Sequence, residues 1–497
     1  MNDKPNLLYI HSDQHSPYVT GCYGDPIVRT PNIDRLAAQG IVFDNVYCPS
    51  PICVPSRMSM LSGRYPFENH VWTNSHILSS AIPTFAHAMG AAGYRPILIG
   101  RMHSLGPDQL HGYAERLVGD HGPNHLGGNS GADRGALSGC AGPSRVSLTQ
   151  SGSGQSSYQI HDEEVTAATI SFLNGLGTKK KAGMDSAPFS ISVGFMLPHQ
   201  PFVARSEDYA LYQDCIQMPR IPQSYSDKLH PHIAQWRRDT DTVEVSNEEI
   251  KRARTAYWAL VTRMDALIGD IIDALRKNDL TDNTIILYMS DHGEQVGEHG
   301  LWWKQTFYEN SVKVPAILSW PGHLPNNVHC DRVVSSLDLN ATMLAALNAP
   351  PLPHSRGRSL LELLHNPGTY WEDIAFSEFC LDAAGAGGPF SEHGVYQRMV
   401  RRGNWKLNYY HGMPCQLFNL ENDPFEMDDL AHNVQFEEIR NELLNEILKD
   451  WDPEWVMGEM AAKRKDQDIL SSWGKQIQPP DQYRWPLLSG MDYLEPG

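Results

Sequence analysis

A cysteine stands at the start of a predicted helix and is followed by Pro55 and Arg57, in the order Cys53-Val54-Pro55-Ser56-Arg57. Proline suits the first turn of a helix, because its missing N–H would have no partner there. Gly63 supplies the end of this helix. Cys53 should therefore lie at a helix N-terminus, where free amides and the helix dipole favour an anion. Arg57 follows one turn later and can reach the same point, so the segment predicts an anion-binding site.

Four predicted strands each run into residues that can do chemistry. The strands cover residues 6–11, 95–99, 189–195 and 284–289, and they lead into Asp13-Gln14, Arg101-Met102-His103, Pro198-His199-Gln200 and Asp291-His292. In an open parallel sheet the carboxyl ends of the strands line one edge, and ligands bind at that edge. We therefore expect these four segments to meet at one site.

Asp13, Asp291 and His292 form a candidate set of ligands for a divalent metal ion. Carboxylate oxygens with one imidazole suit calcium, magnesium or manganese, and manganese tolerates nitrogen more readily. An aspartate after a strand also commonly caps the next turn, which is the competing interpretation for Asp13 taken alone. The Asp-His pair after a second buried strand favours the metal site.

The elements that position these residues belong to an α/β protein. Short apolar, β-rich runs alternate with helical patterns, which predicts a large, mostly parallel sheet covered by helices and including a fifth strand at 314–319. A capping box of Ser246 and Glu249 opens one long helix whose apolar spacing continues to Leu275. The Gly- and Ser-rich segment 119–157 is either a functional loop or a disordered one.

The pattern changes near residue 370. Residues 396–410 and 415–420 are typical of antiparallel strands, with Gly403-Asn404 as turn residues, and a helical pattern follows at 437–450. We predict a catalytic domain over residues 1–369 and a small α+β C-terminal domain over residues 370–497.

Charge and length limit the kinds of partner. The 497 residues can bury a large core, and 40 Lys and Arg against 58 Asp and Glu give a net charge of −18. This balance argues against a nucleic-acid partner, so an anionic substrate must meet a local cluster of cations. No apolar run is long enough to span a membrane. With no signal peptide visible and eight scattered cysteines, we expect a cytoplasmic protein. The tail 451–497 could pack on a neighbour, which leaves a homo-oligomer open.

Together these motifs resemble the type I sulfatases of the alkaline phosphatase superfamily. The likeness is greatest to the branch that holds choline sulfatases, arylsulfatases and phosphonate monoester hydrolases. It covers nearly the whole chain and includes Gly106-Pro107-Asp108-Gln109-Leu110-His111-Gly112, Pro201-Phe202-Val203-Ala204-Arg205, Gly300-Leu301-Trp302-Trp303-Lys304 and Gln416-Leu417-Phe418-Asn419-Leu420. Family members carry substrate-facing residues near segment 119–157, which favours a functional loop there. In this family the cysteine is oxidised to formylglycine by a formylglycine-generating enzyme.

The resemblance implies one divalent metal ion, calcium or manganese, with magnesium as a further choice. Its ligands would be Asp13, the formylglycine at residue 53, Asp291 and His292, with Gln14 where most relatives carry a second acid. Such an ion lowers the pKa of a bound hydroxyl so that it can attack.

The resemblance also implies roles for the residues around the metal. Arg57 would hold the formylglycine, and His199 would protonate the leaving alcohol. The residues implied to contact or border the sulfate are His103, Lys304 and Asn74. Cations that face the sulfate oxygens stabilise charge in the transition state.

Three residues or segments bear on the substrate. Arg101 replaces a family lysine, which keeps the charge but offers a planar fork. Residues 125–128 lack the tryptophan of choline sulfatases, which weakens a cation–π cradle for a quaternary ammonium. Glu378 matches an acid that faces the choline head group.

We predict a sulfatase that hydrolyses a small-molecule or carbohydrate sulfate monoester. One alternative is a phosphonate monoester or phosphodiester hydrolase that uses the same site. Another is a non-catalytic anion-binding relative in which Cys53 stays a thiol. A two-zinc phosphatase is disfavoured, because no Ser or Thr nucleophile and no second full set of His and Asp ligands stand out.

Overall fold

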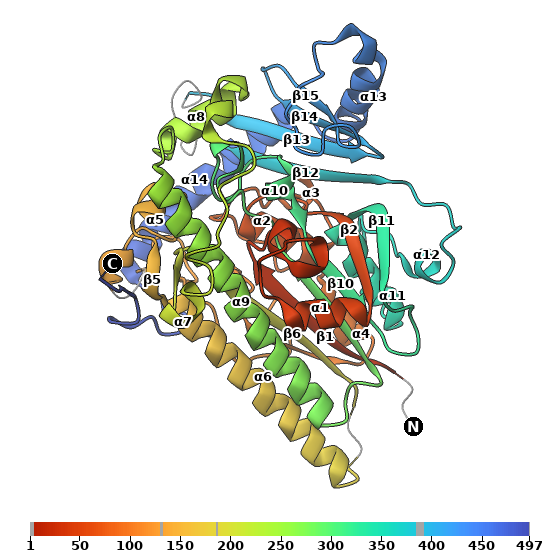
Figure 1. Cartoon of the computed structure of the whole chain (residues 1–497). Coiled ribbons are helices and arrows are strands. Elements are labelled where there is room, and N and C mark those ends of the chain that lie inside the picture. The colour runs from red at the N-terminus through yellow and green to blue at the C-terminus, as the bar shows by residue number, and fades with distance from the viewer. Residues whose placement is uncertain (1–3, 130–132, 185–186, 384–391, 497) are drawn as a thin grey trace.

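A nine-stranded sheet forms the centre of the protein in this computed structural model, which describes residues 4–129, 133–184, 187–383 and 392–496. The strand order is β11-β2-β10-β8-β1-β6-β3-β4, with β9 paired to β2 (Figure 1). The strands are β1 Asn6–Asp13, β2 Ile41–Tyr47, β3 Arg95–Gly100, β4 Glu115–Arg116, β6 Phe189–Pro198, β8 Thr284–Ser290, β9 Lys313–Val314, β10 Ala316–Ser319 and β11 Val328–Ser335. Only β9 and β10 pair antiparallel with their neighbours, so the prediction of a mostly parallel sheet is confirmed.

Helices cover both faces of the sheet (Figure 1). The side chains of β1 show why, because alternate residues of a strand point to opposite faces. Leu8 and Ile10 join a core with α6 Ser157–Lys181 and α9 Asn247–Lys277, whereas Leu7 and Tyr9 join a second core. The helices of that second core are α2 Cys53–Ser62, α4 Phe85–Ala91 and α11 Ser336–Ala346. A parallel sheet buried on both faces results, as its continuous apolar strands require.

The sequence pattern predicts one of the two long helices, α9, but not the other, α6. α9 begins after Ser246, whose hydroxyl accepts from Glu249 N–H in the predicted capping box, and its apolar residues face the core. α6 buries a polar face instead, and its buried residues include Gln159, His161 and Asp162. Without an apolar stripe, periodicity gives no signal for α6. The shorter helices are α1 Pro31–Ala38, α3 Pro66–Asn69, α5 Val146–Thr149, α7 Ser206–Tyr209, α8 Pro231–Asp239, α10 Glu309–Val312 and α12 Leu361–His365.

A four-stranded antiparallel sheet follows the central sheet in sequence. It consists of β12 Ile374–Leu381, β13 Val395–Arg402, β14 Trp405–Tyr410 and β15 Gln416–Asn419, and it packs with α13 Glu437–Leu448 and α14 Pro453–Ile477. Gly403 and Asn404 form the two-residue turn between β13 and β14, because Arg402 pairs with Trp405. A separate small sheet near the C-terminus is thus confirmed, while the domain boundary at residue 370 stays a prediction.

The segment 119–157 is not purely irregular over its described residues, which exclude 130–132. It contains α5 and a strand, β5 Gly152–Gln155, which forms a small sheet with β7 Val203–Ala204 and β16 Tyr493–Leu494. The C-terminal tail therefore packs against its own chain in this structure. Within the described ranges, no helix combines the length and the apolar character needed to cross a membrane.

Candidate active site

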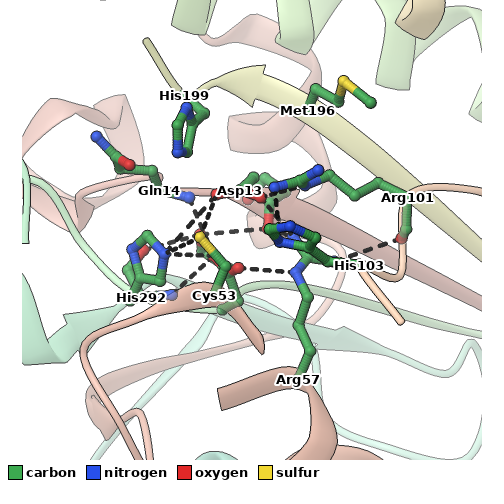
Figure 2. A network of polar contacts seen from close by, with 12 residues as sticks. Asp13, Gln14, Cys53, Arg57, Arg101, His103, Met196, His199 and His292 are labelled. Carbon is green, nitrogen blue, oxygen red and sulfur yellow. Dashed lines mark hydrogen bonds and ion pairs between the residues drawn. The ribbon is translucent and has the colours of Figure 1, made fainter. Parts of the chain in front are cut away.

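The four predicted strand ends meet at one edge of the central sheet (Figure 2). β1 lies between β6 and β8, so Asp13 at its end is flanked by His199, which follows β6, and Asp291, which follows β8. Arg101 follows β3, the next strand beyond β6. Cys53 is the first residue of α2 and reaches the same edge from the helix N-terminus. Parallel strand order explains why these residues, far apart in sequence, come together.

Four side chains surround a point that suits a metal ion. One ligand atom from each of Asp13, Cys53, Asp291 and His292 lies within 4.8 Å of the others, and all four residues are buried. His292 Nδ1 is 3.1 Å from the carbonyl oxygen of Gly293, which can only accept, so Nδ1 carries the proton. Nε2 therefore presents a lone pair toward Cys53 Sγ, 3.2 Å away. The orientation and the two carboxylates fit a divalent cation.

Arg57 contacts the two aspartates of this group. Its Nε donates to Asp291 Oδ2 at 2.8 Å, and its Nη2 lies 3.3 Å from Asp13 Oδ2. The side chain is 1% exposed, so these are fully buried charge pairs. The sequence predicted that Arg57 would reach the position of Cys53, whereas in the structure its guanidinium contacts the carboxylates of Asp13 and Asp291. Arg57 therefore fixes the carboxylates that flank residue 53.

Burial alone would raise the pKa of Asp13, but nearby cations outweigh it and hold that pKa well below its usual value. The largest of these contributions comes from Arg101, and Arg57 and Lys304 add to it. Asp13 is therefore ionised throughout the neutral range, as a metal ligand must be.

Arg101 forms a fork between several acceptors. Its Nε donates to Asp13 Oδ2, its Nη1 lies 3.4 Å from Asp120 Oδ1, and its Nη2 donates to His103 Nδ1 at 2.9 Å. Since a guanidinium can only donate, His103 accepts at Nδ1 and carries its proton on Nε2. Burial, and then Arg101, lower the pKa of His103 well below its usual value. Among the described residues this Nε2–H has no hydrogen-bond partner, so neutral His103 can offer it to a ligand oxygen.

Lys304 links the cysteine to the remaining polar groups. Its Nζ lies 3.4 Å from Cys53 Sγ and 2.8 Å from His199 Nε2, and it also donates to the side-chain oxygen of Gln14. Gln14 Nε2 donates to Gln200 Oε1 at 2.6 Å and to buried Glu294. The Gln14 amide oxygen therefore faces Lys304, while its backbone N–H donates to Asp291 Oδ1 at 3.0 Å.

The thiol at the centre of these contacts is unreactive as it stands. Burial, and then Asp13, raise the pKa of Cys53 to about 11. The reactive form of cysteine is the thiolate, and at neutral pH this side chain is a thiol. An unmodified Cys53 is therefore a poor nucleophile.

Asn74 and Glu378 differ in their relation to this group. Asn74 is exposed, and its Oδ1 accepts from Val54 N–H at 3.0 Å, next to Cys53. Glu378 is 1% exposed, and its carboxylate accepts from Trp72 Nε1 at 2.7 Å and from Phe67 N–H at 3.2 Å. The structure does not bring Glu378 into the group around Cys53. Burial raises the pKa of Glu378 to about 7, and its carboxylate already has hydrogen-bond partners inside the protein.

Sequence reasoning gave no role to Asp120, Glu294 or Gln200. Glu294 follows Asp291-His292-Gly293 directly, so the strand-end argument that found Asp291 could have found it. Asp120 Oδ2 accepts from His103 N–H at 2.8 Å and from Arg116 Nη2 at 2.6 Å, and no local pattern announces this. His125 lies in the loop that lacks the tryptophan of choline sulfatases. Its ring packs against that of Trp473 in α14, with ring centroids 5.5 Å apart.

Comparisons with known proteins agree with this fold. The profile of the Sulfatase family matches residues 5–349, and that of the C-terminal part of N-sulphoglucosamine sulphohydrolase matches residues 297–452. A choline-sulfatase of Rhizobium meliloti is 33% identical over 86% of this chain and 83% of its own. Arylsulfatase K of Homo sapiens is 29% identical over 88% of this chain and 80% of its own.

Solved structures share the fold at lower identity. A phosphonate monoester hydrolase of Agrobacterium radiobacter superposes with a TM-score of 0.71 and 21% identity, over 90% of this chain and 95% of its own. A protein solved with its substrate D-glucosamine-2-N,6-O-disulfate gives a TM-score of 0.69 and 19% identity, over 90% of this chain and 99% of its own. The chain therefore belongs to the sulfatase family. It is a sulfuric ester hydrolase of the alkaline phosphatase superfamily.

Proposed function

We propose that this protein hydrolyses a sulfate monoester with a formylglycine made from Cys53 and one divalent metal ion. The observation that carries the proposal is the environment of Cys53 Sγ. His292 Nε2, Lys304 Nζ and Asp13 Oδ1 approach it at 3.2, 3.4 and 3.7 Å. With its raised pKa, the Cys53 thiol stays protonated and gains nothing from these three polar groups. An oxygen nucleophile at the same position would be activated by them.

Asp13, residue 53, Asp291 and His292 would hold the metal, with Gln14 at its border. When bound, the ion lowers the pKa of a hydroxyl of the formylglycine hydrate and withdraws charge from the ester. Conversion of the thiol to an aldehyde hydrate also replaces a sulfur donor with oxygen, which suits calcium, magnesium or manganese.

The protein's own residues would bind the ester and handle its proton. Lys304, which contacts Cys53 Sγ, and the Nε2–H of His103 would donate to the equatorial sulfate oxygens. His199 lies beside Lys304 and would protonate the leaving alcohol at Nε2. Arg57 and Arg101 hold the carboxylates in place.

The substrate class follows from the relatives. One is a choline-sulfatase, and a structural neighbour binds a glucosamine disulfate. We infer that this chain acts on a small-molecule or carbohydrate sulfate ester. Glu378 does not support choline itself, because its carboxylate is occupied by Trp72 and Phe67.

Sulfate release from choline sulfate, carbohydrate sulfates and an aryl sulfate tests this proposal, with the matching aryl phosphonate and phosphodiester measured beside them. The protein is co-expressed with a formylglycine-generating enzyme, and Cys53→Ala is the control. We expect the sulfate esters to be hydrolysed faster. A higher rate on the phosphonate would favour the alternative activity, because a tetrahedral anion of similar size fits the same cations.

A further inference from the structure

Two fully buried polar side chains, His161 and Asp162, lie in the first turns of α6 and take no part in the chemistry described above. His161 Nδ1 and Asp162 Oδ1 are 2.9 Å apart. A buried pair of this kind is costly unless its remaining hydrogen-bonding atoms also find partners. The partners it finds are backbone groups of two different active-site segments.

Asp162 binds the segment that carries His199. Its carboxylate accepts from Met196 N–H at 2.9 and 3.0 Å and from Leu197 N–H at 2.8 Å. The carbonyl oxygen of Met196 in turn accepts from His199 N–H at 3.0 Å. Figure 2 shows Met196 and His199 on this strand end. One peptide unit therefore separates the Asp162 carboxylate from the backbone of His199.

His161 binds the segment that carries Asp120. Its Nε2 lies 2.9 Å from the carbonyl oxygen of Gly119, which can only accept, so Nε2 donates. The next residue, Asp120, accepts from the backbone of His103 and pairs with Arg101. Trp485 of the tail packs on the His161 ring with centroids 5.3 Å apart and closes this region to solvent.

We propose that the His161–Asp162 pair is a positioning device that holds the His199 segment and the Asp120 segment in register. Asp162 sets where His199 stands relative to the leaving oxygen. His161 sets where Asp120, and through it Arg101 and His103, stand relative to the sulfate. This inference rests on the proposed function, because it requires that His199 protonates the leaving alcohol.

The test compares an alkyl sulfate, which has a poor leaving group, with an activated aryl sulfate. Asp162→Asn keeps the side-chain shape but replaces one acceptor oxygen with a donor. Because an alkoxide needs the proton from His199 and an activated phenoxide does not, we expect kcat to fall about tenfold more on the alkyl ester. Asp162→Glu keeps the charge and displaces it by one methylene, and we expect the same selective loss.

Thr169→Val is the matched control. Thr169 lies on the same buried face of α6, and its hydroxyl donates to Val165 O at 2.7 Å within the helix. This variant loses a buried hydrogen bond of similar kind without touching either active-site segment. We expect equal, small effects on both esters. If Thr169→Val and Asp162→Asn discriminated the esters equally, the pair would be a structural element only and the inference would be wrong.

A double-mutant cycle separates this inference from the proposed function. In a His199→Ala background, Asp162→Asn should change the alkyl ester rate by less than about threefold, since the group that it positions is gone. Full additivity would overturn the positioning role. If His199→Ala itself fails to discriminate the two esters, the acid role of His199 fails instead. A crystal structure of Asp162→Asn then still tests the inference, which requires displacement of residues 196–199.

His161→Phe tests whether His161 positions the Asp120 segment. The phenyl ring fills the space but cannot donate to Gly119 O. We expect KM to rise several-fold for both esters, because His103, which would bind the sulfate, and Arg101, which contacts His103, are held less firmly. A KM equal to that of Thr169→Val would remove His161 from the proposal.

Discussion

Lys304 Nζ lies 2.8 Å from His199 Nε2. An ammonium group can only donate, so His199 accepts at Nε2 and carries its own proton on Nδ1, 2.6 Å from the carbonyl oxygen of Gln200. Burial, and then Lys304, lower the pKa of His199 well below its usual value. His199 is therefore neutral at rest, and under the proposed function it must take up a proton at Nε2, where Lys304 is its neighbour, before it protonates the leaving alcohol. The two residues act as a unit.

Removing the histidine should affect substrates according to their leaving groups. We expect His199→Ala to reduce kcat on an alkyl sulfate by a factor on the order of 10², and to change an activated aryl sulfate far less. Turnover of both esters by the same preparations measures this. Equal loss on the two esters would contradict the assignment of His199 as the general acid.

Removing the lysine should affect every substrate. Lys304→Met removes a buried cation that faces the Cys53 position and contacts His199 Nε2, so we expect kcat/KM to fall by about 10² on aryl sulfates and further on alkyl sulfates. Lys313→Met provides the control, because Lys313 Nζ donates to Asn45 elsewhere in the protein. A variant of Lys304 that kept full activity on aryl sulfates would exclude contact with the sulfate.

Metal binding should depend on Asp291. The wild-type protein is expected to contain one divalent ion per chain by elemental analysis, and Asp291→Asn is expected to lose it together with activity. Asp338→Asn replaces another buried aspartate, which caps α11, and serves as the control. Chelation of the wild-type ion should also lower its thermal midpoint, since a ligand that binds only the native state stabilises it. A metal-free wild-type protein with full activity would refute this account.

Buried neutral histidines should make stability fall in acid. Burial lowers the pKa of His299 from 6.5 to about 4. The unfolded chain therefore binds more protons between these values, so the free energy of unfolding is highest above pH 6.5 and decreases as pH falls toward 4. A shift of this size corresponds to about 3 kcal/mol.

His299→Asn, which removes the titrating ring, should flatten this dependence. Denaturant unfolding of both proteins across this pH range provides the measurement. The exposed His365→Asn is the control and should follow the wild-type curve. A His299→Asn curve as steep as that of the wild type would contradict the prediction.

The residues that the sequence places correctly are those with local signals. Asp13, His199 and Asp291 each follow a recognisable apolar strand, and the order of parallel strands brings strand ends together. The C-terminal hairpin was readable for the same reason, because Gly403-Asn404 fits a two-residue turn.

The residues that it misplaces depend on distant partners. The sequence predicts the charge of Arg101. Its ion pairs with Asp13 and Asp120 depend on how β1 and β3 lie in the sheet, which the sequence does not give. Glu378 was expected at the substrate, whereas the structure buries its carboxylate beside Trp72, outside the group around Cys53. Helix α6 was missed because many of its core-facing residues are polar, which breaks up its apolar pattern.

The mass of the tryptic peptide that contains Cys53, measured after co-expression with a formylglycine-generating enzyme, tests the central claim most directly. Oxidation of the thiol to the aldehyde removes one sulfur and two hydrogens and adds one oxygen. We predict this mass in active preparations, with sulfate release proportional to the converted fraction. A protein that hydrolyses sulfate esters while its Cys53 peptide keeps the full mass of the thiol would contradict the account.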